Sequence, residues 1–273
     1  MMFRESLSWR LRAGATLLFV APASIAIADE PPEQETKRWQ VMLGAGAGSR
    51  PEYPGSDEDE IRPVPVVNIR YGRFFLGGVP GGGGGGGLGA NLFGNDRWSF
   101  GAAVSFDIGE VREERDDPVQ LRGLGDIDGT TRAGLFARYE ITDWLELSAN
   151  ALSDVGGEDQ GLVASLELEA SYQPLPRLRL SAGPGVTWGD DEYAQTLYGI
   201  DSGQSLRSGR ALYDPGSSAT TMRFSLGAQY ALTSKWSLGS RITASRLLGD
   251  AADSPIVEDE NASSYSLFVL YRF

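Results

Sequence analysis

The stretch that decides the fold is residues 265–273, which read YSLFVLYRF. Apolar residues occupy every second position, and serine and arginine are found only between them. A period of two is typical of a β-strand with one apolar face, so we predict a strand that ends on an aromatic residue. The apolar face consists of Tyr265, Leu267, Val269, Tyr271 and Phe273. Such a strand fits either the closing strand of a membrane β-barrel or the last strand of a soluble β-sandwich.

The rest of the chain favours strands over membrane helices. Its 273 residues fit one large β domain or two ordinary domains. After the first thirty positions no apolar window approaches about 18 residues, so a membrane-spanning helix is excluded there. A membrane location would therefore require a barrel.

Two residue types with special chemistry are absent. The chain contains no cysteine and no histidine. This removes disulfides and thiolate metal sites, and it also removes the commonest general base and metal ligand. We therefore predict no catalytic residue, no metal site and no cofactor, and a protein that is not an enzyme.

The first 28 residues have the pattern of a signal peptide. Three arginines precede a short apolar run at 13–20, and the small-x-small site Ala26-Ile27-Ala28 follows. A buried N-terminal helix fits less well, because the acidic, proline-rich stretch 29–35 comes next. We predict a signal peptide at 1–28, a short N-terminal periplasmic segment at 29–36 and a barrel at 37–273.

The net charge is strongly acidic. It is −13 for the whole chain, and removing the three arginines and one glutamate of residues 1–28 makes it −15. A surface of this charge repels nucleic acid, so we expect no nucleic-acid partner.

Alternating apolar and polar residues predict about twelve strands. The clearest runs from Arg97 to Asp107, where Trp98, Phe100 and Val104 share one face with two more apolar residues. The expected strands are 37–48, 61–70, 73–79, 88–93, 97–107, 132–141, 145–151, 162–172, 177–188, 222–230, 235–244 and 265–273. We expect Pro63 and Pro65 to lie at the outer end of the second strand, because proline cannot donate a ladder hydrogen bond. We expect the prolines at 174–176 to end the eighth.

The connections between these strands alternate between long and short. The long stretches 49–60, 108–128 and 189–217 are each followed, one strand later, by a turn of a few residues. Nothing in a soluble sandwich requires long and short connections to alternate. An outer-membrane barrel does show this alternation, because its periplasmic turns are short and its external loops are longer. We therefore predict an all-β, antiparallel up-and-down transmembrane barrel in the outer membrane. Its partners would be membrane lipid and the barrel-assembly machinery, which reads the closing strand.

Aromatic residues lie near the predicted strand ends, where interfacial girdles are expected. They are Trp98, Tyr139, Trp188, Tyr230, Trp236, Tyr265 and Tyr271.

The polar faces of the strands carry charges that would line the lumen. Both signs occur, so these residues either line an ion path or pair across a narrow lumen and close it; we favour mixed pairing. They are Arg132, Arg138, Glu140, Glu146, Glu167, Glu169, Arg177, Arg179, Arg223 and Arg241.

Three other features have simpler explanations. The run Gly81 to Gly87 matches G-x-G-x-x-G formally, but no strand-helix unit follows, so we interpret it as a flexible loop that merges into a strand. The acidic clusters at 57–60, 113–117 and 190–192, with Asp126 and Asp128, lack calcium-loop spacing and are interpreted as solvated charge. Apolar residues of the 189–217 loop have near-helical spacing and would either plug the lumen or pack on the barrel rim.

Several stretches resemble the MipA/OmpV family of outer-membrane proteins, the MltA-interacting protein group. They are RPEYPGSD at 50–57, RPVP at 62–65, LRGLGDID at 121–128, AGLF at 133–136, LRLSAGP at 178–184 and SRLLGDAADSPIV at 245–257. The seven-glycine run departs from the family pattern. The resemblance implies an outer-membrane location and a scaffold that joins a lytic transglycosylase to a murein synthase in peptidoglycan assembly. A small-solute pore is the alternative, and the resemblance supplies no catalytic residues.

Overall fold

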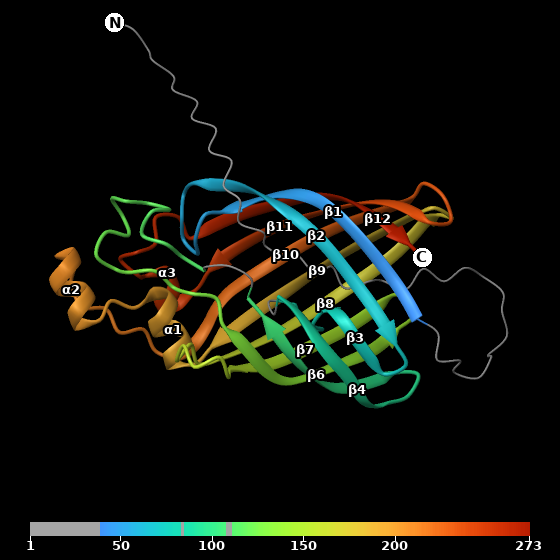
Figure 1. The fold of residues 1–273 in the computed structure, drawn as a ribbon, viewed down its shortest axis with the longest axis horizontal. Helices are drawn as coiled ribbons and strands as arrows, with labels where there is room; N and C mark the ends of the chain where they lie inside the picture. The colour runs from blue at the N-terminus through green and yellow to red at the C-terminus, as the bar shows by residue number, and fades with distance from the viewer. Residues whose placement is uncertain (1–38, 83–84, 108–110) are drawn as a thin grey trace, which may run out of the picture.

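The described chain forms a single closed barrel. The computed structural model describes residues 39–82, 85–107 and 111–273. Twelve antiparallel strands follow one another in sequence order around the barrel, and the last pairs with the first (Figure 1). The up-and-down barrel of about twelve strands is thus confirmed. The predicted signal peptide at 1–28 and the segment at 29–36 lie outside the described residues.

The strands agree with the predicted ranges to within a few residues at most ends. Three short helices lie in the long connections, and among the described residues no helix is long and apolar enough to cross a membrane. The elements are β1 Trp39–Pro51, β2 Asp59–Tyr71, β3 Phe74–Gly78, β4 Gly86–Gly94, β5 Trp98–Phe106, β6 Thr131–Thr142, β7 Leu145–Asp154, β8 Leu162–Leu175, β9 Leu178–Gly189, α1 Asp191–Tyr198, α2 Ser202–Ser208, β10 Ser218–Ala231, β11 Trp236–Leu247, α3 Gly249–Ala252 and β12 Asn261–Arg272.

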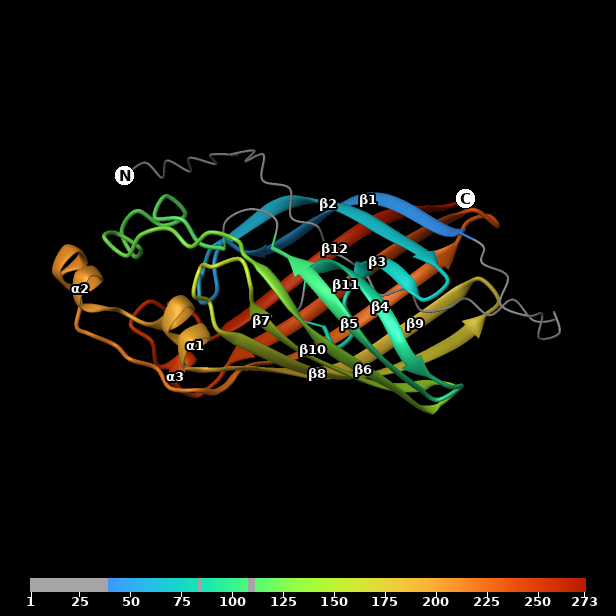
Figure 2. The ribbon, with the colours of Figure 1, turned by 60° about the horizontal axis from the view of Figure 1, so that its bottom comes forward.

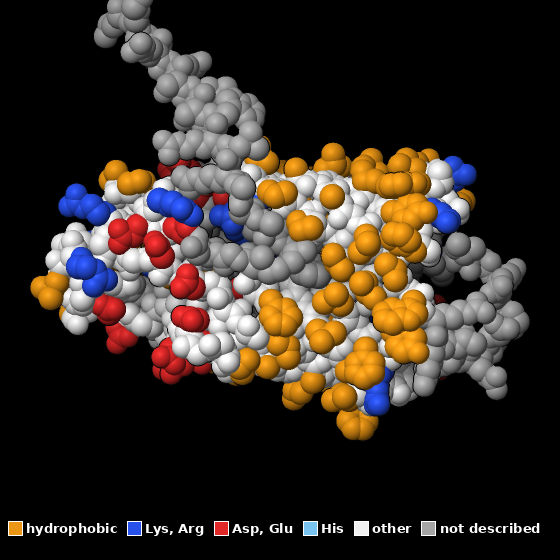
Figure 3. Space-filling view, viewed as in Figure 1, with side chains coloured by type: hydrophobic (Ala, Val, Ile, Leu, Met, Phe, Trp, Pro, Cys, Tyr) orange, Lys and Arg blue, Asp and Glu red, His pale blue; other side chains and the backbone are white. Residues whose placement is uncertain are grey.

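The alternation of the closing strand separates two environments. In β12 the side chain of Leu267 is 56% exposed on the outer surface, whereas its neighbour Phe268 is 5% exposed and faces inward. Apolar side chains gather over the strands in the space-filling view, and Asp and Glu side chains gather at the end that carries the helices (Figure 3). This is the distribution expected of a barrel with a lipid-facing band.

The two ends of the barrel differ in the length of their connections. Short turns at 72–73, 95–97, 143–144, 176–177 and 232–235 mark the periplasmic end, where the described chain also begins and ends. The connections at the external end are 52–58, 79–85, 107–130, 155–161, 190–217 and 248–260. Figure 2 shows all three helices at the external end, opposite the C-terminus. The predicted alternation is confirmed.

Stacked aromatic rings border the periplasmic end. Trp98 stacks on Tyr139 with 4.1 Å between ring centroids, and Trp39 stacks on Tyr71 at 4.6 Å. Amphipathic rings at this level fit the interface between hydrocarbon and water.

The expected positions of the prolines were wrong. Pro65 is the middle residue of β2 and lies opposite Ala45, and Pro63 lies opposite Ala47. Prolines are tolerated there because, among the residues that the structure describes, the outer part of β2 pairs with β1 alone. Pro174 does not end β8, which continues to Leu175 across an irregularity in its pairing with β9.

Candidate functional site in the barrel lumen

After β3 the chain turns inward, and residues 80–82 lie across the lumen. Asn150 of β7 donates through Nδ2 to the carbonyl oxygens of Pro80 at 2.7 Å and Gly82 at 3.0 Å. Arg223 of β10 donates through Nη2 to the carbonyl of Gly81 at 3.2 Å. Because β7 and β10 are four and five strands away from β3 around the barrel, these bonds hold residues 80–82 against the opposite wall. We call residues 80–82 the crossing segment.

Glycine is required where the crossing segment meets that wall. Gly81 and Gly82 have φ angles of +99° and +65°, which L side chains rarely adopt. A Cβ on Gly82 would overlap Glu167 Oε2 and Arg223 Nη2, and a Cβ on Gly81 would lie 2.7 Å from the backbone nitrogen of Asn150. The first part of the glycine run therefore lies across the lumen against the opposite wall, and its last part, Gly86–Gly87, begins β4.

Charges of opposite sign lie side by side on the lumen wall. Each arginine meets its acid from another element. Two of the pairs link neighbouring parts of the wall, and the other two link β8 with β10 and with β11, which are not its neighbours in the sheet. The pairs are Arg132–Asp107 at 3.5 Å, Arg138–Glu146 at 3.2 Å, Arg223–Glu167 at 3.6 Å and Arg241–Glu169 at 3.5 Å. Opposite charges in a narrow, water-poor space attract more strongly than in bulk water, so this arrangement narrows the path.

The structure places the remaining predicted charges differently. Arg179 donates to Ser171 Oγ at 3.1 Å. Glu140 is exposed near the periplasmic end of β6. Arg177 is exposed in the turn at 176–177, so its assignment to the lumen wall was wrong. It lies in the turn because β8 continues past Pro174 and moves the turn toward β9.

Two polar residues that contribute to the site were not singled out from the sequence. Asn150 holds the crossing segment, and Asp107 pairs with Arg132. Both lie on the polar face of their predicted strands, so the alternation of apolar and polar residues predicts that their side chains face the lumen. The alternation does not predict which residues these side chains contact.

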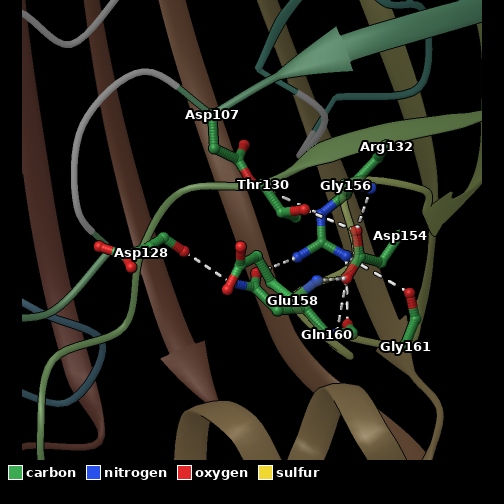
Figure 4. Close-up of polar contacts among 9 residues, drawn as sticks. All are labelled: Asp107, Asp128, Thr130, Arg132, Asp154, Gly156, Glu158, Gln160 and Gly161. Atoms are coloured by element: carbon green, nitrogen blue, oxygen red, sulfur yellow. Dashed lines mark hydrogen bonds and ion pairs between the residues drawn. The ribbon is translucent and has the colours of Figure 1, made fainter.

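A polar cluster closes the external rim beside β6 and β7. Arg132 donates to the Oε1 of Gln160 at 2.8 Å, and Gln160 donates to the carbonyl of Asp128 at 2.6 Å. Asp154 accepts from Thr130 Oγ1 at 2.5 Å and from the backbone nitrogen of Gln160 at 2.9 Å. Figure 4 shows these side chains converging between the 107–130 and 155–161 connections, so the cluster fixes both connections to the wall.

Four external connections share one small hydrophobic core, and we call the resulting layer the cap. The core contains one or two residues from each of the connections 52–58, 107–130, 190–217 and 248–260: Tyr53, Leu121, Leu124, Ile200 and Ile256. Polar ties reinforce it, since the Tyr53 hydroxyl donates to Glu258 at 2.8 Å and Gln204 donates to the carbonyl of Leu124 at 2.8 Å.

Helix α1 lies at the base of the cap. Asp190 accepts from the backbone nitrogen of Tyr193 at 2.9 Å and caps the helix. Tyr198 packs against Leu247 at the end of β11 and Ala251 of α3. The helical spacing predicted in this loop is therefore present, and its apolar residues pack on the rim and on neighbouring loops.

Burial in the cap perturbs two ionisable groups. Arg112 is buried, donates to the carbonyl of Leu197 at 3.2 Å, and burial lowers its pKa to about 10. Burial raises the pKa of the Tyr53 phenol, and the hydrogen bond to Glu258 raises it further.

A cavity of about 480 Å³ lies between the cap and the barrel wall. Its lining includes Tyr53 and Tyr198 of the cap, Arg132 and Thr187 of the wall, and Gly85 beside β4. This volume is within the range of ligand pockets, about 300–1,000 Å³.

The acidic clusters build turns and caps. Asp117 accepts from the backbone nitrogens of Val119 at 2.9 Å and Gln120 at 2.8 Å, and Asp190 caps α1. Within the part of the chain that the structure describes, no group of three or more acidic side chains is arranged to hold a metal ion.

The chain is similar to several known proteins. The chain is similar to the MltA-interacting protein of Escherichia coli K12, with 29% identity over 235 residues that cover 86% of this chain and 90% of that protein. The outer membrane protein YiaT of the same strain is 26% identical, with coverage of 86% and 91%. An outer membrane channel from Pseudomonas putida F1 is a structural neighbour with a TM-score of 0.49 and 16% identity, covering 93% of this chain and 100% of that one.

The similarity to YiaT, together with the closed barrel of twelve strands, places the chain in the outer membrane. The family model described as MltA-interacting protein MipA matches residues 43–273. This match covers most of the described barrel, from β1 to the last residue of the closing strand. The chain therefore belongs to the MipA family of outer-membrane β-barrel proteins.

Proposed function

We propose that this barrel is a non-enzymatic structural protein that binds murein enzymes at its periplasmic end and is closed to free diffusion. The observation that carries the second part is the crossing segment, which is hydrogen-bonded to the opposite wall beneath a cap with its own core. The first part is supported by the name of the relatives, MltA-interacting protein. The expected partners are a lytic transglycosylase and a murein synthase.

The geometry limits where such partners bind. The periplasmic turns contain only two to four residues each. A stable interface buries roughly 800 Å² on each partner, more than one such turn offers. We therefore expect a partner to contact several turns of the rim at once, together with the predicted periplasmic segment at 29–36.

Retention of partners on the purified barrel tests this proposal. The immobilised barrel is incubated with a purified lytic transglycosylase and a purified murein synthase, and the bound fraction is measured. Arg177→Glu reverses a charge in an exposed periplasmic turn, and Arg122→Glu makes the same change in an exposed external connection. We expect the first variant to weaken retention and the second to leave it unchanged. Equal retention by both variants and by the wild type would argue against the rim as the binding surface.

A small-solute pore is the second candidate. The specific observation in its favour is the mixture of arginine and glutamate on the lumen wall, which would suit a polar path if the crossing segment moved. Steady large conductance together with no retained murein enzyme would make the pore the leading function. Lipase or protease activity of the refolded barrel would contradict the non-enzymatic assignment.

A further inference from the structure

The ladder that closes the barrel is weakest between β2 and β3. These strands pair at three positions, Ile69–Leu76, Arg70–Phe75 and Tyr71–Phe74, whereas β1 and β2 pair at thirteen. Strand β3 ends at Gly78, but β2 continues outward to Asp59. Figure 1 shows β3 as a short arrow beside the much longer β2. Within the described ranges, no strand pairs with this side of residues 59–68. We call this unpaired border the seam.

Prolines remove hydrogen-bond donors along the seam. The two-residue turn at 72–73 makes Tyr71 and Phe74 the closing pair of a hairpin, with their backbone groups facing each other. Backbone direction alternates along a strand, so positions 63, 65 and 67 also point toward the seam. Pro63 and Pro65 have no N–H there. A strand edge without N–H donors does not pair with a further strand. The prolines also reduce the number of unpaired N–H groups that face the membrane.

An apolar cluster lies in the lumen on each side of the seam. On one side Val64 and Val66 of β2 face inward and pack with Phe268 and Leu270 of β12. On the other side Phe75 of β3 packs with Val79, Ala103 and Phe136. Four ion pairs lie on the wall from the end of β5 to β11. Two more lie beside the seam toward its external end, where Glu60 of β2 pairs with Arg50 of β1 and with Arg62. The interior is therefore amphipathic, and beside the seam its apolar part at Val64 and Val66 lies between the charged Glu60–Arg62 group and Asn68.

The lipid-facing surface continues near both the seam and the cavity. Ile61, which faces outward near the external end of β2, is 65% exposed, so the lipid-facing surface continues beside the seam. Phe106 belongs to the outward face of β5 and is exposed, yet it also lines the cavity beneath the cap together with Gly85. Phe106 is therefore a place where the cavity lies close to the outer face of the barrel.

We propose that the seam is a lateral portal through which a molecule with one long alkyl chain and a polar head passes between the outer leaflet and the cavity. The alkyl chain lies along the two apolar clusters, and the head faces the charged wall. This role does not depend on the murein-linked function. It is also compatible with a lumen closed to water-soluble solutes, because the route bypasses the crossing segment.

A photoactivatable palmitic acid with a diazirine on its chain tests the portal. The wild-type barrel is reconstituted in liposomes that contain this probe, irradiated, and the labelled residues are located by mass spectrometry. We expect labels on the inward-facing residues Val64, Val66 and Phe268 in addition to the lipid-facing surface. Labels confined to outward-facing residues would overturn the proposal.

A pair of variants adds specificity to the map. Val66→Trp fills the lumen beside the seam, and Thr243→Trp adds the same bulk to β11, whose ladder is paired on both sides. We expect inward labelling to fall several-fold in the first variant and to stay near the wild-type level in the second, with folding checked by heat-modifiability. An equal fall in both would show that the seam is not the route. If Val66→Trp does not fold, the wild-type map alone decides.

Discussion

Gly82 is the residue on which closure of the lumen depends most directly. Its positive φ and the absence of a side chain let the crossing segment lie against Glu167 and Arg223. We expect Gly82→Ala to destabilise the barrel by about 1–3 kcal/mol, because an added methyl group overpacks this contact. The matched control is Gly125→Ala, since Gly125 also has a positive φ, +77°, but nothing lies within 4 Å of its Cβ position.

Thermal unfolding followed by heat-modifiability compares the two variants. Both substitutions place alanine at a positive φ and cause similar backbone strain. The difference between the two unfolding temperatures therefore reports the contact with Glu167 and Arg223. Equal unfolding temperatures would mean that the crossing segment is not held against the wall.

In the cap, Tyr53 joins two connections, because its ring lies in the shared hydrophobic core and its hydroxyl donates to Glu258. Tyr53→Phe removes the hydrogen bond to Glu258 but keeps the ring in the core, so we expect a loss of about 1 kcal/mol in cap stability. Hydrogen exchange of peptides from 52–58 and 248–260 should become faster, while exchange of the strands stays unchanged. Unchanged exchange in these peptides would contradict the role of the hydrogen bond.

The cap should also weaken at alkaline pH. Burial and the bond to Glu258 raise the pKa of Tyr53 in the folded state above the unfolded value of about 10. Its contribution to stability is therefore fully present below about pH 10 and is lost as the pH rises toward the folded pKa. Near-ultraviolet circular dichroism should show this loss in the wild type and a smaller change in Tyr53→Phe. An identical alkaline loss in the variant would assign it to other groups.

At the scale of the elements, the strands were predictable because each has one lipid-facing and one lumen-facing side. Residues 97–107 show this alternation almost without exception, and β5 spans Trp98–Phe106. The sequence-based prediction was wrong where a residue's place depends on whether a neighbouring strand pairs with it. Pro65 was placed at a strand end because a central strand normally needs its N–H. The sequence does not reveal that β3 pairs only with residues 69–71 of β2 and stops short of Pro65.

The closing strand carries the prediction that Phe273 contributes to assembly. Phe273→Asp should lower the amount of barrel in the outer membrane, because the terminal aromatic residue is the expected signal for the assembly machinery. Phe93→Asp is the control, since Phe93 at 75% is about as exposed as Phe273 at 69% and also lies toward the periplasmic end. Outer-membrane fractions are compared by immunoblot. An equal defect in both variants would indicate a general cost of charge at the membrane surface and no specific signal.

At the scale of the whole molecule, the sequence predicted the strands that form the barrel wall. It predicted little of what lies inside the barrel or above it. The polar faces identified most of the paired charges, because period-two alternation fixes the direction of each side chain. The crossing segment and the cap join connections that are far apart in the chain, such as Pro80 with Asn150 and Tyr53 with Glu258. Such contacts depend on barrel closure and on the path of each loop, and no local pattern encodes them.

The central claim is that the lumen is closed by the crossing segment and the cap, and single-channel conductance in planar bilayers tests it most directly. We expect the wild-type barrel to show no steady large conductance. A double variant, Asn150→Ala with Arg223→Ala, removes the side chains that hold residues 80–82 and should increase conductance. Steady large conductance of the wild type, unchanged in the double variant, would contradict the claim.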